Sequence, residues 1–468
     1  MVLGDNLVRQ ADEPQWASYR CGRFFTVFRG GLRVSTQINA DQINHEGHLL
    51  IGGVDTTSLA KQYGTPLIAY DTNNIRQQIR NFKKIFDEEQ VDYQISYASK
   101  AFATIAMYQL INQENIHCDV VSGGEIYTAA QAGFPMGKVS FHGNNKSYEE
   151  LELALDQNIG CIILDNFHEI ELLSQLTDKR GQDIDVMFRV TPGISAHTHE
   201  YVMTGQEDSK FGFDINSGQA DDAIQQVLAT RHLNPIGIHC HIGSQIFATD
   251  GFIMAAQKMM ALLHHWQVKF DFLAPVVNLG GGFGIQYTDD EKPLQPESFI
   301  KAILHEMKRI AAETQMKLPE IWIEPGRSIV GNAGVSLYTV GSRKVIPGVR
   351  TYVAVDGGMG DNIRPALYQA KYETVVANKL TQPVTETVSI AGKYCESGDM
   401  LAWDQKLPKT EAGDLLAILD TGAYGYSMAS NYNRNPRPAV VFCENGTSKL
   451  IVKRESLQDL IRQDLPLE

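Results

Sequence analysis

The chain alternates short apolar runs with longer segments in which apolar residues recur at a helical period. Each run is rich in β-branched and other apolar residues, ends in polar residues or glycine, and precedes an amphipathic stretch. There are eight such runs, at 93–97, 117–121, 138–142, 161–165, 184–190, 235–241, 275–279 and 320–323. Strands that alternate with helices predict right-handed crossovers and a parallel sheet.

The number of runs favours a closed barrel over an open doubly wound sheet. Alternation alone fits either arrangement, but eight strand–helix units are what a (β/α)8 barrel requires. Polar residues at the ends of the runs support the barrel, which gathers its active site at the carboxyl ends of its strands. They are Lys100, Asn144, Asn166, His241, 280–282 and Glu324. We therefore predict an α/β fold with a (β/α)8 TIM-like barrel.

The periodicity changes after Gly331, where helical stretches become sparse and strand-like segments are separated by Gly, Pro and Asn. This change predicts a second, mainly antiparallel β domain. Its clearest strands are expected at 335–340, 351–355 and 415–419. The predicted domains are the barrel over 67–331 and the β domain over 332–468, the latter joined by early strands within 39–66, near 48–51.

The first 38 residues differ from the rest of the chain. They are rich in arginine and lack the long apolar run of a secretory signal. Asp5, Asp12 and Glu13, together with the scarcity of serine, argue against a transit peptide. We expect residues 1–38 to be a poorly ordered extension or the product of an early-assigned start codon.

Composition favours a globular protein that acts on small molecules. The 468 residues are 43% hydrophobic and 21% charged, and no stretch approaches the roughly 20 apolar residues that a membrane-spanning helix requires. The net charge of -14 opposes nonspecific binding to nucleic acid, which needs a basic face. The six cysteines include no CxxC pair, so neither a zinc site nor a disulfide framework is indicated. This cysteine usage suits a reducing cytoplasm.

Lys100 ends the first predicted barrel strand, within the sequence Tyr-Ala-Ser-Lys-Ala. Its amine is therefore expected in the barrel mouth, where desolvation would free it to form an imine. A lysine at a strand end is by itself weak evidence, because most lysines are solvated surface residues.

A glycine-rich run, Asn-Leu-Gly-Gly-Gly-Phe-Gly at 278–284, follows the seventh predicted strand. Glycines let backbone N–H groups approach an anion, and barrels often bind phosphate with the loops after strands seven and eight. The second of those loops is Glu-Pro-Gly-Arg-Ser at 324–328. The spacing fits neither a Rossmann fingerprint nor a P-loop. A plain glycine-rich turn is the alternative.

Glu324 emerges from the apolar strand Ile-Trp-Ile, where an unpaired carboxylate would be costly. A protonated pyridine nitrogen would satisfy it, and the carboxylate would in turn keep the ring an electron sink. The structural alternative is a salt bridge to Arg327.

The sequence His239-Cys-His241 ends the sixth predicted strand and places two imidazoles on one side of it. Such a pair can bind a metal, but the further His and Asp ligands of a metal-dependent barrel hydrolase cannot be placed. We favour one histidine stacked on an aromatic cofactor and the other packed or hydrogen-bonded, with no metal.

The second domain contributes three candidate groups. Cys395, which Glu396 and Asp399 flank, is a thiol that could donate a proton to a carbanion, although a cysteine is more often an inert core residue. Arg364 and Tyr368 supply a cation and a phenol suited to a substrate carboxylate.

Together these segments resemble the diaminopimelate decarboxylases, which use pyridoxal 5'-phosphate (PLP) and share the alanine-racemase-like fold group with ornithine and arginine decarboxylases. The resemblance spans about residues 40–450. It rests on an ordered set of motifs: Tyr-Ala-Ser-Lys100-Ala, Asp119-Val-Val-Ser-Gly-Gly-Glu125, Phe141-His-Gly-Asn-Asn-Lys146, His239-Cys-His-Ile-Gly-Ser-Gln245, the triple glycine, Glu324-Pro-Gly-Arg327, Cys395-Glu396-Ser and Gly-Ala-Tyr424. Lys393-Tyr394 departs from the proline and apolar residue that the family often has there, so the path of that loop is open.

The resemblance implies a role for each candidate residue. Lys100 would hold PLP as a Schiff base, His241 would stack on its ring, and Glu324 would pair with its pyridine nitrogen. The rest of the cofactor site would be Ser244, Gly280, Gly281, Gly282, Pro325, Gly326, Arg327 and Tyr424. The substrate contacts would be Arg327, Arg364, Tyr368, Glu396 and Tyr424.

The implied reaction is decarboxylation of meso-2,6-diaminopimelate to L-lysine and CO2, the last step of lysine biosynthesis. Cys395 or Lys100 would return the proton to the α-carbon. Cys395 and Glu396 would come from the neighbouring subunit of a homodimer, so that each site is shared.

Two alternative functions remain open. One is a decarboxylase of ornithine, arginine or carboxynorspermidine on the same barrel, and the other is a non-catalytic PLP-binding homologue.

Overall fold

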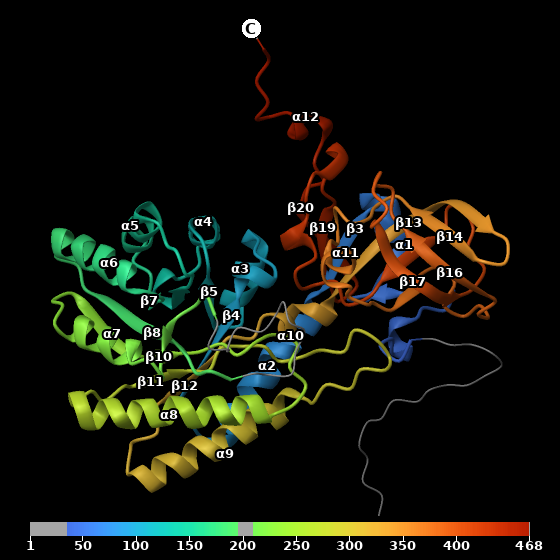
Figure 1. The fold of residues 1–468 in the computed structure, drawn as a ribbon. Helices are drawn as coiled ribbons and strands as arrows, with labels where there is room; N and C mark the ends of the chain where they lie inside the picture. The colour runs from blue at the N-terminus through green and yellow to red at the C-terminus, as the bar shows by residue number, and fades with distance from the viewer. Residues whose placement is uncertain (1–34, 195–208, 468) are drawn as a thin grey trace, which may run out of the picture.

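The computed structural model describes residues 35–194 and 209–467, which form two domains (Figure 1). Helices surround a bundle of parallel strands in one domain, and a twisted sheet forms most of the other. Residues 1–34 of the expected extension lie outside the described residues. Of residues 35–38, Thr36 donates from Oγ1 to Asp289 at 2.6 Å, and Ile38 packs against the core of the second domain.

Eight parallel strands close into the predicted barrel. Strand β10 pairs with β11 on one side and with β8 on the other, which completes the ring. The strands are β4 (Tyr93–Ala98), β5 (His117–Val120), β6 (Val139–Phe141), β7 (Cys161–Leu164), β8 (Ile184–Thr191), β10 (Leu233–His239), β11 (Val276–Asn278) and β12 (Glu320–Ile323). Each lies within one of the eight predicted runs or extends it by a few residues, so the (β/α)8 prediction is confirmed. The two-residue β9 (Phe213–Asp214) adds to β8 outside the ring.

Seven of the barrel strands are followed by a helix that packs outside the ring. These helices are α3 (Ile105–Gln113), α4 (Gly123–Gln131), α5 (Tyr148–Asp156), α6 (Phe167–Arg180), α7 (Gln219–Leu228), α8 (Asp250–Phe270) and α9 (Pro296–Thr314). The eighth strand leads only into the short α10 (Arg327–Val330). The eighth position is taken by α2 (Thr72–Glu89), which precedes β4 and packs against α9. Its buried stripe of Ile75, Ile79, Phe82 and Phe86 has the helical spacing that this packing requires.

The second domain is mainly antiparallel, as predicted. Its strands pair in the order β17-β16-β14-β13-β3-β19-β20, with β18 added beside β13 and β15 beside β18. Only the β14–β16 and β19–β3 pairs of this sheet are parallel. The strands after the barrel are β13 (Gly334–Ile346), β14 (Arg350–Val355), β15 (Thr374–Val376), β16 (Glu386–Ala391), β17 (Met400–Leu407), β18 (Leu415–Ile418), β19 (Ala439–Glu444) and β20 (Thr447–Val452). Helices α11 (Arg364–Tyr368) and α12 (Leu457–Leu460) are short.

The N-terminal boundary of the barrel differs from the prediction. Segment 67–71, expected to open the barrel, is β3 (Leu67–Asp71), which pairs with β13 and β19 in the second sheet. The strand expected near 48–51 is only β1 (Leu50–Ile51), paired with β2 (Val54–Asp55) in a separate hairpin before α1 (Thr56–Tyr63). Figure 1 shows this blue N-terminal segment among the orange strands of the C-terminal part.

Strand β3 is apolar on both faces because it joins two cores. Leu67 and Ala69 pack into the core of the second domain, whereas Ile68 and Tyr70 pack into the barrel core. This division follows the period of two along a strand. The Tyr70 hydroxyl also donates a 2.7 Å hydrogen bond to the carbonyl of Gly422, so a chain segment that leads into the site is attached here.

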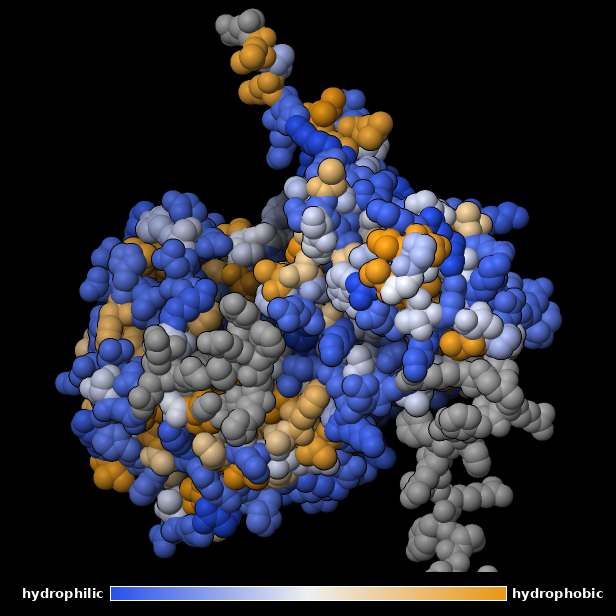
Figure 2. All heavy atoms as spheres, turned by 45° about the vertical axis from the view of Figure 1, so that its right-hand side comes forward, coloured by the Kyte–Doolittle hydropathy of each residue, from blue (hydrophilic) through white to orange (hydrophobic). Residues whose placement is uncertain are grey.

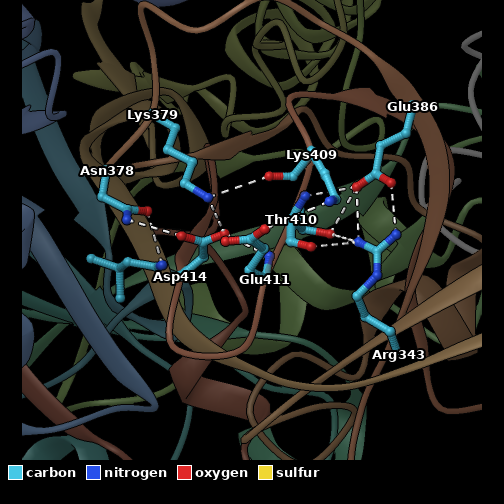
Figure 3. A network of polar contacts seen from close by, with 9 residues as sticks. Arg343, Asn378, Lys379, Glu386, Lys409, Thr410, Glu411 and Asp414 are labelled. Carbon is cyan, nitrogen blue, oxygen red and sulfur yellow. Dashed lines mark hydrogen bonds and ion pairs between the residues drawn. The ribbon is translucent and has the colours of Figure 1, made fainter.

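Paired charges fix the outer end of the second domain (Figure 3). Arg343 of β13 donates to Glu386 of β16 at 2.7 Å, and Glu386 also accepts the backbone N–H of Thr410 at 2.7 Å. Burial would raise the pKa of Glu386, but Arg343 and Thr410 lower it to about 2. Lys379 donates to Asp414 at 2.7 Å in the same network. These groups are therefore structural.

The molecular surface carries no large apolar face in the view of Figure 2, where hydrophobic side chains form small patches on both domains among hydrophilic ones. In the described part of the chain, none of the helices is long and apolar enough to span a bilayer.

We expect Gly422→Ala to destabilise the junction between the two domains. An added Cβ would lie 1.9 Å from the carbonyl oxygen of Val330, a backbone atom that cannot rotate away. Overpacking of this kind costs about 1–3 kcal/mol, measurable by urea unfolding. The matched control is Gly137→Ala, because no atom lies within 4 Å of its added Cβ. Equal stability of the two variants would show that the junction does not require a glycine at position 422.

Candidate active site

A cavity of about 750 Å³ lies at the carboxyl ends of the barrel strands and reaches the second domain. A smaller cavity of about 30 Å³ shares part of its lining. The lining common to both includes Lys100, Asp119, His241, Ser244, Glu324, Arg327 and Tyr424. The fold therefore brings together most of the residues that the sequence predicted for one site.

Lys100 lies in a short 3-10 turn (Ser99–Ala101) that follows β4. Glu125 fixes the start of this turn, since its carboxylate accepts from the Ser99 hydroxyl at 2.8 Å and from the Val121 N–H at 2.7 Å. At the other end, the N–H of Tyr424 donates to the Ala101 carbonyl at 2.9 Å. The lysine is thus held by the barrel on one side and by the second domain on the other.

Glu324 is a buried carboxylate surrounded by polar side chains of other strands. Asn278 Nδ2 donates to Oε1 at 2.6 Å, and His239 Nε2 donates to Oε2 at 3.1 Å. His142 Nε2 lies 3.1 Å from Oε1. Burial would raise the pKa of Glu324, but His142 and His239 hold it well below its usual range. The carboxylate is therefore ionised.

The two histidines beside Glu324 are neutral. Burial lowers the pKa of His239 to about 4 and also lowers that of His142. Glu324 has no arginine or lysine within ion-pair distance among the described residues, so the alternative of a salt bridge to Arg327 is wrong. The carboxylate carries a negative charge that a protonated ring nitrogen would match.

His239 and His241 do not direct their ring nitrogens at one cluster of ligand atoms. His241 Nδ1 accepts the N–H of Gly281 at 3.3 Å, away from the ligand atoms of His142, His239 and Glu324, which lie within 4.8 Å of one another. His239 is the histidine of the pair that is hydrogen-bonded to Glu324, and both histidines line the larger cavity.

The small cavity has the features of a phosphate cradle. Gly281, Gly282 and Gly326 line it, and a Cβ at Gly282 would lie 2.3 Å from the carbonyl oxygen of Gly243. The backbone of Gly282 has φ +109°, a conformation that favours glycine. Ser328 also lines the cavity, and its buried hydroxyl has no hydrogen-bond partner among the described residues. An anionic group with acceptor oxygens would satisfy that hydroxyl.

Two buried arginines meet on the side of the second domain. Arg327 Nη2 donates to Ser244 at 2.9 Å, and Arg327 and Arg364 both donate to the Tyr287 hydroxyl, Arg364 at 3.0 Å. Arg364 also donates to Tyr372 at 2.6 Å. No carboxylate within the described ranges lies within ion-pair distance of either guanidinium. They form a pair of cations available to an anionic group, and Tyr368 and Tyr424 line the same region.

Cys395 and Glu396 do not line the cavity of their own chain. Both side chains are exposed, in a loop of the second domain. The loop is well fixed: Tyr394 N–H donates to Asp399 at 2.8 Å, and Cys395 N–H donates to Asn433 at 2.8 Å. Lys393 N–H donates to Gly357, a bond that proline could not make, so the path of this segment is now defined.

Sequence reasoning did not assign His142, Asn278, Tyr287 and Tyr372 to the site. His142 and Asn278 stand at strand ends and carry the same positional signal as Glu324. Tyr287 and Tyr372 lie in irregular segments, where no periodicity marks a functional position.

Comparisons with known proteins agree with this geometry. Residues 72–331 match the family model described as "Pyridoxal-dependent decarboxylase, pyridoxal binding domain". Diaminopimelate decarboxylase of Bacillus subtilis (strain 168) is 57% identical over 425 residues, which cover 91% of this chain and 97% of that protein. The chain belongs to the diaminopimelate decarboxylase family.

Solved structures extend the family assignment to three dimensions. The crystal structure of diaminopimelate decarboxylase from M. jannaschii in complex with L-lysine has a TM-score of 0.85 and 35% identity, over 91% of this chain and 98% of that one. Lysine/ornithine decarboxylase from Vibrio vulnificus, complexed with putrescine, has a TM-score of 0.70 but only 20% identity, over 83% of this chain and 97% of that one. The second likeness shows the fold alone.

We expect the stability of this diaminopimelate decarboxylase family member to fall as the pH drops from about 6.5 to 4. In that window the unfolded chain protonates His239 at its ordinary pKa, whereas the folded chain keeps it neutral down to a pKa of about 4. His239→Asn retains a donor for Glu324 and removes this titration. Its pH dependence should be flatter by roughly 2–3 kcal/mol, measured by urea unfolding of the cofactor-free protein.

The control for this measurement is His45→Asn, because the His45 side chain is 91% exposed. Its stability should follow the wild-type pH dependence. If His239→Asn also follows the wild-type curve, the buried His239 is not the source of the pH dependence.

Proposed function

We propose that this chain decarboxylates meso-2,6-diaminopimelate to L-lysine and CO2 with PLP as cofactor. The observation that carries the proposal is the pair of guanidiniums of Arg327 and Arg364 in the cavity that Lys100 and Glu324 line, which have no carboxylate partner among the residues that the structure describes. Diaminopimelate has a second carboxylate remote from the reacting carbon, and two adjacent cations suit it. Ornithine and arginine lack that group.

The residues present fit PLP at both ends of the molecule. The buried Ser328 hydroxyl and the lining glycines suit a phosphate, and the ionised Glu324 suits a protonated pyridine. When bound, PLP supplies the electron sink that accepts the electron pair left by departing CO2. Lys100 is proposed as the amine that anchors the cofactor and His241 as the group against its ring. Ser244, Gly280–Gly282, Pro325–Arg327 and Tyr424 are proposed to complete its site.

We propose that residues on the side of the cavity that faces the second domain orient the substrate. Arg327 and Arg364 would hold the distal carboxylate, with Tyr368 and Tyr424 beside it. Because the Tyr287 hydroxyl accepts from both arginines, their spacing is set before a substrate enters. Because the arginines and Lys100 would bind opposite ends of the substrate, their separation would select substrates of one length.

A homodimer with shared active sites is part of the proposal. Cys395 and Glu396 are exposed in a fixed loop away from their own cavity, which suits insertion into the cavity of a neighbouring subunit. There Glu396 would contact the distal ammonium group, and the Cys395 thiol would protonate the α-carbon. We propose the cytoplasm as the location, which agrees with the free thiols of the described cysteines.

We expect purified protein with PLP to release CO2 from meso-diaminopimelate and not from ornithine or arginine. In Arg364→Ala, kcat/KM for diaminopimelate should fall by roughly 10- to 150-fold, because a charge-assisted hydrogen bond is worth about 1.5–3 kcal/mol. Arg350→Ala changes an arginine stacked on Trp403, away from the cavity, and should leave turnover unchanged. Release of CO2 from ornithine and not from diaminopimelate would refute the substrate assignment.

Mixing two inactive variants tests the shared site. Lys100→Ala removes the anchoring amine, and Cys395→Ala removes the proposed acid. A mixed dimer of the two would contain one site with both residues intact, so activity should return after subunit exchange, which native mass spectrometry can follow. If mixed dimers form without activity, Lys100 and Cys395 do not serve one site across the interface.

A further inference from the structure

Asn278 lies at the end of β11 between the two halves of the proposed cofactor site. Its side chain is fully buried. Nδ2 donates to Glu324 Oε1 at 2.6 Å, and Oδ1 accepts the N–H of Gly280 at 2.9 Å. One amide therefore contacts both the carboxylate proposed to face the pyridine and Gly280, the glycine that directly precedes Gly281 and Gly282 of the phosphate cradle.

A third hydrogen bond closes these contacts into a ring. The N–H of Glu324 donates to the carbonyl of Gly280 at 2.8 Å. The ring thus runs from Gly280 to Asn278, from Asn278 to Glu324, and from Glu324 back to Gly280. It fixes the end of β11 relative to the end of β12, which neighbours it in the barrel.

The orientation of the amide is determined by its two partners. Glu324 is ionised and can only accept, whereas the Gly280 N–H can only donate. Rotation of the amide by 180° would place its oxygen against the carboxylate and its NH2 against the N–H. Both hydrogen bonds would then become repulsive contacts in a buried site, so a single arrangement is stable.

We propose that Asn278 is a positioning residue that sets the separation between the phosphate cradle and the pyridine partner. It would contact neither end of the cofactor directly, but it holds Glu324 and the backbone of Gly280, which leads into the cradle glycines Gly281 and Gly282. The inference rests on PLP binding in this cavity and is independent of which amino acid the enzyme decarboxylates. Asn278 thereby makes the two ends of the cofactor bind cooperatively.

Two substitutions separate the two functions of the amide. Asn278→Asp keeps an oxygen for the Gly280 N–H but replaces the amide donor to Glu324 by a carboxyl group, which either repels the Glu324 carboxylate or must take up a proton. Asn278→Ala removes both contacts. Only the alanine variant should loosen the cradle, whereas both should displace the carboxylate.

The experiment measures dissociation constants for PLP and for pyridoxal, which lacks the phosphate, by absorbance and tryptophan fluorescence. The dissociation constant for pyridoxal divided by that for PLP reports the contribution of the phosphate end. We expect PLP affinity to fall by roughly 10- to 150-fold in both variants, as expected for lost hydrogen bonds to a charged group. The ratio should stay near the wild-type value in Asn278→Asp and fall in Asn278→Ala.

The matched control is Asn234→Asp. Asn234 also lies on a barrel strand and donates Nδ2 to the carboxylate of a neighbouring strand, Asp185, at 2.6 Å. It is exposed and stands at the opposite end of β10 from the site. This variant should bind PLP and pyridoxal as the wild type does.

The outcomes distinguish this inference from the proposed function. If wild-type protein binds no PLP, the proposed function fails. If the wild type binds PLP and folded Asn278→Asp binds it within threefold as tightly, the positioning role is refuted. The same conclusion follows if both Asn278 variants lose affinity with identical changes in the ratio, because a general loss of packing would produce that result. Should Asn278→Ala fail to fold, the near-isosteric Asn278→Asp variant still tests the positioning role, through its PLP affinity and its ratio of dissociation constants.

Discussion

The ionised carboxylate of Glu324 is the interaction on which the site depends. It is buried, and its hydrogen-bond donors are neutral groups from other strands. An arginine in their place would form a complete ion pair and would leave no charge for a protonated ring. Neutral donors stabilise the anion and leave its charge to be matched by a ligand.

Closure of the barrel is what makes this arrangement possible. His142 follows β6, which is three strands away from β12 along the sheet. In a flat sheet those strands would be about 14 Å apart at a spacing of about 4.8 Å. His142 Nε2 nevertheless lies 3.1 Å from Glu324, because the two side chains meet across the barrel mouth. The polar cluster and the closed architecture therefore depend on each other.

The sequence predicts much of this fold because its periodicities are clear. All eight barrel strands were located, and Lys100, His241 and Glu324 were expected in the barrel mouth from their positions at strand ends. The domain boundary predicted at residue 67 placed the segment of β3 in the barrel domain; Leu67–Tyr70 is apolar on both faces, and only tertiary pairing shows which sheet such a segment joins. The role of Tyr287 depends on contacts with Arg327 and Arg364, which come from different domains, and no local pattern encodes such contacts.

The loop that carries Cys395 gives the strongest physical support for a site completed by a second chain. Exposed loops are commonly mobile, and ordering one on association costs free energy. Here Asp399 and Asn433 accept backbone N–H groups of the loop, and Tyr394 stacks on Tyr432 with ring centroids 6.1 Å apart. The loop is thus ordered within its own chain before any partner arrives. An exposed thiol on a pre-ordered loop, together with an arginine pair that has no acidic partner among the described residues, suits two subunits that complete each other's sites.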